Sequence, residues 1–386
     1  MASSENPFAF GHYVEGDFFT DRTEDAKRLL SNLTHGINTI LISPRRWGKS
    51  SLVRKVIASS KYTHPDVRFV MVDIFACKSE YEFYKMLASA VMKQTSSKID
   101  ELVELGKRFL SNISPKFSFG SDPMTDFSVS FEWSPKDGTE EEILQLPEKI
   151  AKEKGIRIVV CIDEFQQIME FQDPLTFQKK LRTVWQQHQQ TTYCLYGSKR
   201  HMMLKMFHDT NCPFYRFGEL MFLQKISRKD WISFICHRFE ITGKHITENQ
   251  AEQIYELTEG ISTYVQNLSW IVWYKAESAV QNKHIEEALN DLIAQNRVFF
   301  QRDIESLTGL QKNFLVAMAN GVTSGFTKQN TILKYNLVNS ANIQVAKKSL
   351  STKEFIDYDE TSIQFNDPIF KLWIERNIKV ISILDI

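Results

Sequence analysis

The 386-residue sequence has no net charge, because 47 lysines and arginines balance 47 aspartates and glutamates. No global charge therefore draws the chain to nucleic acid or to an anionic membrane. Its 5 cysteines are scattered and never form a C-x-x-C pair. Neither a disulfide framework nor a zinc site is expected, and reduced thiols fit a cytoplasmic protein.

Long apolar runs are also missing. The longest are the length of a strand, such as residues 156–162, so no membrane span is expected. The first residues lack a basic start and an apolar core, unlike a signal peptide. Hydrophobic and charged fractions of 42% and 24% are typical of a soluble globular protein. The length predicts two or three domains.

What the sequence does contain is a phosphate-binding pattern near its amino end. The aliphatic run Thr39–Ile42 enters a turn, and Gly48-Lys49-Ser50 then opens a segment with helical apolar spacing. In such a loop, backbone N–H groups and a helix N-terminus hold an anion. Gly48 would allow close approach of the backbone, Lys49 would reach the β- and γ-phosphates, and Ser50 would ligate Mg²⁺. Ser43 stands where the G-x-x-x-x-G-K-[ST] pattern has its first glycine.

A second informative stretch is the apolar run 156–162, which is followed directly by Asp163 and Glu164. The run predicts a strand buried on both faces, and ligands of α/β sheets bind at the carboxyl ends of strands. By themselves the acids would be interpreted as the exposed end of a strand. Combined with the phosphate-binding pattern, they predict that Asp163 holds Mg²⁺, partly through water. Glu164 would polarise the water that attacks the γ-phosphate.

A third run of the buried type, residues 192–196, ends in Gly197 and Ser198. A polar side chain at this position would lie between the phosphate loop and the acidic pair. Ser198 is therefore a candidate to orient the attacking water. A simple Gly-Ser turn at the end of a strand explains the segment equally well.

Alternating strands and helices up to residue 225 predict a parallel α/β sheet with helices on both faces. A β-hairpin is expected at about 112–136, with its turn at Gly120-Ser121-Asp122-Pro123. Residues 226–300 have the pattern of a helical lid, and three helices and a hairpin in 301–386 predict a winged helix. The first domain is expected to be 1–225.

Two segments leave alternatives open. The aromatic segment at residues 6–20 is expected to pack on the first helix, and the alternative places Phe8, Val14 or Phe18 beside an adenine ring. The winged helix could read DNA with its third helix. From Asp303 to Ile386, however, nine basic residues are balanced by nine acidic residues, so this segment has no net positive charge for DNA. A packing or protein-contact role is therefore favoured.

Stretches in order along nearly the whole chain resemble the archaeal and bacterial AAA+-like P-loop ATPases, near their signal-transduction and origin-recognition branch. The residues that carry the resemblance are Asn6-Pro7-Phe8, Phe18, Asp21-Arg22, Glu24, Pro44-Arg45-Arg46, Gly48-Lys49-Ser50, Ile162-Asp163-Glu164-Phe165, Gly197-Ser198, Pro213-Phe214-Tyr215 and Phe365-Asn366-Asp367-Pro368-Ile369-Phe370-Lys371-Leu372-Trp373.

The resemblance implies a set of site residues. Nucleotide would be contacted by Ser43, Pro44, Arg45, Arg46, Trp47, Gly48, Lys49, Ser50 and Ser51, with Mg²⁺ at Ser50 and Asp163 and catalysis by Glu164. Arg216 matches a family arginine that contacts the γ-phosphate of its own or a neighbouring nucleotide. Ser262 departs from the Gly-x-Pro that is common in the family, and no arginine follows it.

The predicted function is a Mg²⁺-dependent ATPase, with ATP and ADP as ligands, whose hydrolysis drives or times a conformational switch. One alternative is a nucleotide-dependent regulatory or scaffold module with negligible hydrolysis. Another is a DNA-binding regulator that acts through the winged helix. The partner stays open between another protein and a second copy of the chain, while charge does not support DNA and no membrane is expected.

Overall fold

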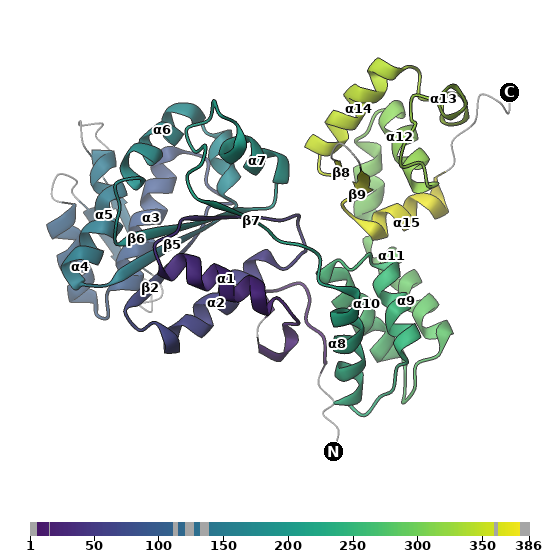
Figure 1. The fold of residues 1–386 in the computed structure, drawn as a ribbon, viewed down its shortest axis with the longest axis horizontal. Helices are drawn as coiled ribbons and strands as arrows, with labels where there is room; N and C mark the ends of the chain where they lie inside the picture. Colours follow the sequence, from purple (N-terminus) through teal and green to yellow (C-terminus); the bar gives the residue numbers. More distant parts are fainter. Residues whose placement is uncertain are drawn as a thin grey trace. The chain divides into compact units, whose positions relative to one another are not determined.

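The computed structural model describes residues 6–14, 16–110, 115–119, 127–131, 139–358 and 362–378. The chain divides into two compact units (Figure 1). We call Arg22–Gln224 the P-loop unit. Met1–Asp21 together with Lys225–Ile386 form the second, which we call the helical unit.

A parallel five-stranded sheet with the strand order β2-β5-β6-β1-β7 forms the centre of the P-loop unit. The strands are β1 (Thr39–Ile42), β2 (Val67–Asp73), β5 (Arg157–Asp163), β6 (Thr191–Gly197) and β7 (Glu219–Phe222). The three central strands are buried over nearly their whole length, as their continuous apolar runs predict. Because all strands run parallel, their carboxyl ends share one edge of the sheet.

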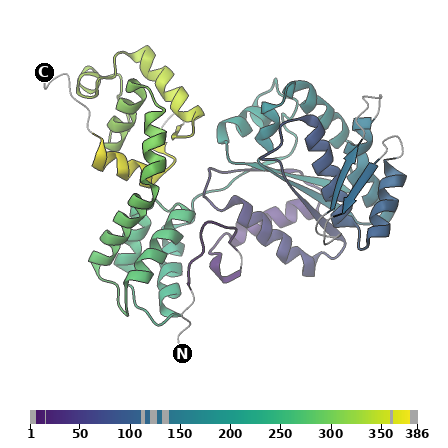
Figure 2. The same cartoon turned by 180° about the vertical axis from the view of Figure 1, so that it is seen from behind.

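Helices cover both faces of this sheet (Figure 1). On one face lie α1 (Thr23–Thr34) and α2 (Lys49–Thr63), and on the other α3 (Glu80–Thr95), α5 (Thr139–Lys154), α6 (Pro174–Trp185) and α7 (Arg200–His208). Figure 2 shows the two layers from behind. The predicted parallel α/β architecture is confirmed.

Two smaller elements are attached to the α3 side. Helix α4 (Ile99–Phe109) contacts α3 and α5, and β3 (Pro115–Phe119) pairs antiparallel with β4 (Phe127–Phe131). The two strands lie within the stretch in which a hairpin is expected. The expected turn at Gly120-Ser121-Asp122-Pro123 lies outside the described residues.

The helical unit begins with α8 (Arg228–Glu240), α9 (Glu248–Leu257), α10 (Ser262–Lys275) and the long α11 (Asn282–Glu305). It continues with α12 (Gly309–Ala319), α13 (Gln329–Tyr335), α14 (Ser340–Thr352), the paired strands β8 (Ile356–Tyr358) and β9 (Ile363–Phe365), and α15 (Pro368–Asn377). Capping boxes at Thr247 and Thr308 start α9 and α12, because each threonine and the glutamine three residues later satisfy each other's backbone N–H. Three helices and a hairpin form the predicted winged helix, which is confirmed.

The amino-terminal arm corrects one expectation. Residues 6–21 belong to the helical unit, so packing of the arm on the first helix is wrong. The Phe8 ring packs against Phe234 and Phe239 of α8 at centroid distances of 6.2 and 5.7 Å, and Arg238 donates a hydrogen bond of 2.6 Å to the Pro7 carbonyl. At 1% exposure Phe8 is not free to stack on an adenine ring. The arm has this position because its aromatic ring fills the apolar face of α8.

Among the described residues, no helix has both the length and the apolar character that crossing a membrane requires.

Candidate functional site

The loop between β1 and α2 contains two residues with left-handed backbone, Arg46 (φ 69°) and Gly48 (φ 86°). A Cβ on Gly48 would meet no atom within 4 Å, so the backbone conformation and not lack of space requires glycine here. Ser43 is 1% exposed, and its Oγ donates 3.0 Å to the Pro44 carbonyl. Since Ser43 is not among the residues with positive φ, serine fits this position without backbone strain.

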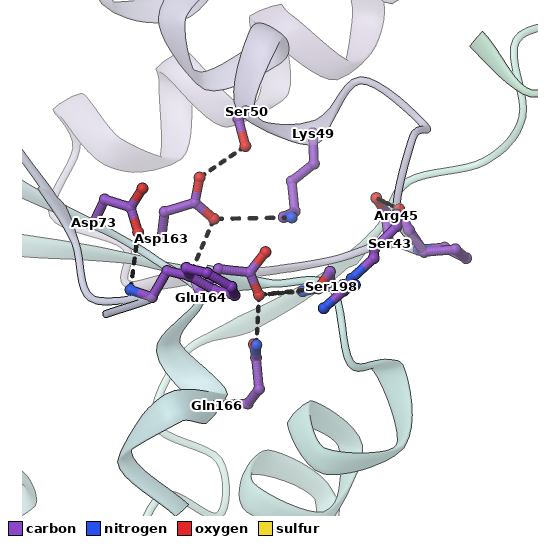
Figure 3. Close-up of polar contacts among 11 residues, drawn as sticks. Ser43, Arg45, Lys49, Ser50, Asp73, Asp163, Glu164, Gln166 and Ser198 are labelled. Carbon is purple, nitrogen blue, oxygen red and sulfur yellow. Dashed lines mark hydrogen bonds and ion pairs between the residues drawn. The ribbon is translucent and has the colours of Figure 1, made fainter. Parts of the chain in front are cut away.

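The first turn of α2 directs Lys49 and Ser50 at the carboxyl end of β5 (Figure 3). The Ser50 Oγ donates a 2.7 Å hydrogen bond to Asp163 Oδ2. Lys49 is 7% exposed, and its Nζ lies 3.9 Å from Asp163 Oδ1, which is too long for a hydrogen bond. A buried ammonium and a buried carboxylate thus form an ion pair without a direct hydrogen bond between them.

Asp163 is 7% exposed. Burial raises the pKa of its carboxyl, and the Lys49 charge and the Ser50 hydroxyl oppose that shift without cancelling it. A carboxylate whose ionised form is incompletely compensated favours an additional cation beside it.

Glu164 follows with a left-handed backbone (φ 53°), which is uncommon for a residue with a side chain and is often found at functional sites. Its Oε2 accepts hydrogen bonds from Ser198 Oγ at 2.9 Å, from Ser198 N at 3.3 Å and from the Gln166 side chain. Burial alone would raise the pKa of Glu164, but the Lys49 charge and the hydrogen bonds from Gln166 and Ser198 hold it below its usual range. The carboxylate is therefore ionised at neutral pH.

Ser198 connects the phosphate loop to this acid. It is 5% exposed at the carboxyl end of β6, and its Oγ accepts a 3.3 Å hydrogen bond from Arg45 Nε while donating to Glu164. The structure thus brings together the side chains of Arg45, Lys49, Ser50, Asp163 and Glu164 with Ser198, as Figure 3 shows.

Arg216 is not part of this arrangement. It precedes β7, whose first residue, Glu219, donates a 2.8 Å hydrogen bond from its backbone N–H to the carbonyl of Asn38, which lies just before β1. Arg216 therefore lies at the amino end of the strands, whereas the phosphate loop follows their carboxyl ends. Its guanidinium lies 5.1 Å from the centroid of the Tyr215 ring. Arg216 therefore lies apart from the other candidate residues of this site, and its contact with the γ-phosphate of its own or a neighbouring nucleotide stays a prediction.

Comparison with solved structures finds proteins that share the fold of the chain. The Walker-type ATPase Paby2304 of Pyrococcus abyssi aligns with a TM-score of 0.68 and 17% identity, over 95% of this chain and 99% of that chain. The ORC2 protein of Aeropyrum pernix in its ADPNP–ADP complexes aligns with a TM-score of 0.50 and 13% identity, over 97% and 98%. The chain therefore shares the fold of this Walker-type ATPase and of the ORC2 protein.

The winged helix is also found from the sequence. Residues 298–376 match a family described as a probable winged helix domain. The ADP form of the same Aeropyrum pernix ORC2 protein aligns with a TM-score of 0.50 and 14% identity, over 93% of this chain and 92% of that chain. No curated protein sequence matches the chain.

Two residues near the candidate site were not predicted from the sequence. Gln166, 2% exposed in the 3₁₀ helix η2 (Phe165–Glu170), donates to Glu164. Arg22, 4% exposed, donates 2.9 Å to the Trp47 carbonyl in the phosphate loop. The only signal in the sequence was the presence of Asp21-Arg22 among the stretches that carry the family resemblance.

The side chains present suit Mg²⁺. Ser50 and Asp163 offer adjacent oxygen ligands, and Mg²⁺ is usually bound by one or two protein oxygens together with water and substrate phosphates. In the described part of the chain, no group of three or more His, Cys, Asp and Glu side chains could hold a metal ion. A magnesium site completed by water and phosphate oxygens therefore fits these residues better than a closed protein cage.

Proposed function

We propose that the chain is a Mg²⁺-dependent ATPase in which ATP binding and hydrolysis drive a conformational switch. The observation that carries the proposal is the buried Lys49–Asp163 pair, 3.9 Å apart at the end of a phosphate loop. An anion between the loop and Lys49 would compensate the ammonium charge, and a cation beside Asp163 would compensate the carboxylate charge. The AAA+-like fold, which the chain shares with a protein solved in ADPNP–ADP complexes, supports a nucleotide as that anion.

In this proposal each group has a defined task. Backbone N–H groups of residues 45–49 and the Lys49 ammonium bind the phosphates at the amino end of α2. Ser50 and Asp163 hold Mg²⁺, which neutralises negative charge on the phosphates when it is bound. Burial of the site excludes bulk water and so strengthens these electrostatic contacts.

Glu164 is the proposed general base. Its described hydrogen bonds all go to Oε2. The other oxygen, Oε1, is left to accept a proton from water as that water's oxygen bonds to the γ-phosphorus and the bond to ADP breaks. Ser198 and Gln166 fix the direction of the carboxylate, so they are positioning residues.

The remaining parts of the chain are proposed to respond to the nucleotide. We propose a lid at 226–300 and a winged helix at 301–386, with the P-loop core completed by residue 225. Arg216 would act on its own or a neighbouring nucleotide, where an arginine offsets charge that develops in phosphoryl transfer.

Isothermal titration calorimetry with ATP and Mg²⁺ tests the binding site through Lys49→Ala. Because the variant leaves the phosphates without their buried cation, we expect affinity to fall by about a hundredfold or more. Lys61→Ala is the matched control, since Lys61 is an exposed lysine on the same helix. Equal affinity of wild type and Lys49→Ala, or no ATP binding by the wild type, would refute the proposal.

A further inference from the structure

Arg22 is a buried arginine that the proposed chemistry does not use. It is the first residue of the P-loop unit, precedes α1 and is 4% exposed. Both Asp21 and Arg22 have left-handed backbone, with φ of 53° and 59°. Two successive non-glycine residues in this region are strained, and such strain persists only where surrounding contacts hold it.

The contacts that hold Arg22 lead to two distant parts of the chain. Its Nη1 donates 2.8 Å to the carbonyl of Gln224, and its Nη2 donates 2.9 Å to the carbonyl of Trp47. Asp25 lies 3.2 Å from Nη1 and offsets the buried positive charge. Gln224 is the last residue of the P-loop unit. One guanidinium therefore joins the phosphate loop to both points at which the chain crosses between the units.

The contact with Trp47 bears on anion binding through peptide geometry. The Trp47 carbonyl and the Gly48 N–H belong to one peptide unit, and no cis peptide bond occurs among the described residues. In a trans peptide, C=O and N–H point in opposite directions, so fixing the carbonyl also fixes the N–H. Gly48, at one end of this peptide, and Arg46, one residue before Trp47, both have left-handed backbone. Arg22 thus holds the carbonyl side of the peptide that carries the Gly48 N–H.

We propose that Arg22 is a positioning residue that couples occupancy of the phosphate loop to the chain crossing at Gln224–Lys225. An anion that binds the Gly48 N–H restricts the motion of the Trp47–Gly48 peptide. Because the Arg22 guanidinium is hydrogen-bonded to both carbonyls, the Gln224 carbonyl is then restricted as well. Coupling is reciprocal, so loss of Arg22 weakens nucleotide binding as well as the response of the crossing. The inference rests on the proposed nucleotide site and specifies how that site is connected to the rest of the chain.

The test uses the full-length chain with Arg22→Gln and Arg22→Lys. Lysine keeps the positive charge but lacks the planar guanidinium that donates to two carbonyls. The lysine variant therefore still tests the proposal if the glutamine variant does not fold. Arg28→Gln is the matched control, because Arg28 is an exposed arginine on the same helix that pairs with Glu219. ADP affinity is measured first by calorimetry, followed by deuterium exchange of the backbone amides of residues 223–228 with and without saturating ADP.

In the wild type, ADP should slow exchange at 223–228. In both Arg22 variants, ADP affinity should fall by about tenfold, and saturating ADP should no longer slow exchange there. Arg28→Gln should behave like the wild type. A saturated Arg22→Lys protein with wild-type protection at 223–228, or a wild type that binds ADP without any change there, would overturn the coupling alone. A wild type that fails to bind ADP in the calorimeter would instead remove the proposed function and the coupling with it.

Discussion

Buried charged side chains lie at both ends of the parallel strands, the amino edge and the carboxyl edge of the sheet. The two edges differ in how fully hydrogen bonds satisfy these charges. At the amino edge, the Glu148 carboxylate accepts hydrogen bonds from the backbone N–H groups of Gln189, Gln190 and Thr191 at 2.9 to 3.3 Å. At the carboxyl edge, Lys49 and Asp163 remain 3.9 Å apart. The positive-φ residues Arg46 and Glu164 lie at the carboxyl edge as well.

We interpret the difference as one between a structural network and the proposed binding site. Burial would raise the pKa of Glu148, but the backbone N–H of Gln189 and the Lys152 ammonium hold it below its usual range, so the native fold favours the ionised carboxylate. Asp163 has a raised pKa despite its cation, which marks a charge that the protein alone does not fully compensate. Substitutions at the amino edge should therefore lower the stability of the fold without changing ligand affinity. Substitutions at the carboxyl edge should change ligand affinity.

Glu148→Gln should give the largest loss of stability, and it tests whether the amino edge has a purely structural role. An amide cannot accept from all three N–H groups and keep the Lys152 ion pair, so we expect the free energy of unfolding to fall by about 3 kcal/mol. Urea unfolding measures the loss, while ATP affinity should stay at the wild-type value. Glu141→Gln, an exposed glutamate on the same helix, should be nearly neutral. An equal loss in the two variants, or weaker ATP binding in Glu148→Gln, would contradict the assignment.

The second effect concerns acid stability at the amino edge. Burial lowers the pKa of His188 to about 4 from 6.5. His188 contacts the Tyr193 hydroxyl at 2.9 Å and Gln145 at 3.1 Å. Because the native pKa is the lower one, the unfolded chain binds the proton first, and stability falls as pH drops from 6.5 to about 4.

Over that window His188 should cost about 2 kcal/mol, allowing for its partial exposure, and His188→Gln should remove that part of the slope. Glu148 acts at lower pH, since a carboxylate with a lowered pKa loses its contribution only as pH falls below its usual value of 4.5. Unfolding measured at several pH values checks the profile. An unchanged slope in the variant would show that His188 does not titrate as described.

The smallest stability effect compares two glycines. Gly48 at the carboxyl edge and Gly155 at the amino edge both have positive φ, 86° and 62°, and neither would bring a Cβ within 4 Å of another atom. Alanine at either position should cost about 1 kcal/mol, because the backbone conformation alone is unfavourable. Only Gly48→Ala should also weaken ATP binding in calorimetry. Equal ATP affinity in the two variants would show that the phosphate loop at Gly48 does not bind ATP.

The sequence predicted the central strands well, because each is a continuous apolar run. The run 156–162, for example, lies within Arg157–Asp163 apart from its first residue. Helix α4 was not predicted, although Leu102 and Leu105 give it an apolar face that could have been found.

Site residues were predictable where a local motif carries them. Gly48, Lys49 and Ser50 lie on consecutive positions, and Asp163 ends a recognisable strand. Arg22 was not predictable, because its partners Trp47 and Gln224 come close only through tertiary folding. The position of Arg216 likewise depends on strand direction and register, which its own segment does not encode.

The central claim is ATP hydrolysis with Glu164 as the base, and a single-turnover assay of Glu164→Gln with excess protein, ATP and Mg²⁺ tests it most directly. The account predicts that the variant binds ATP with near wild-type affinity but hydrolyses it at least about a hundredfold more slowly. Glu170→Gln, an exposed glutamate in η2, should retain the wild-type rate. A Glu164→Gln protein that hydrolyses bound ATP at the wild-type rate would contradict the account.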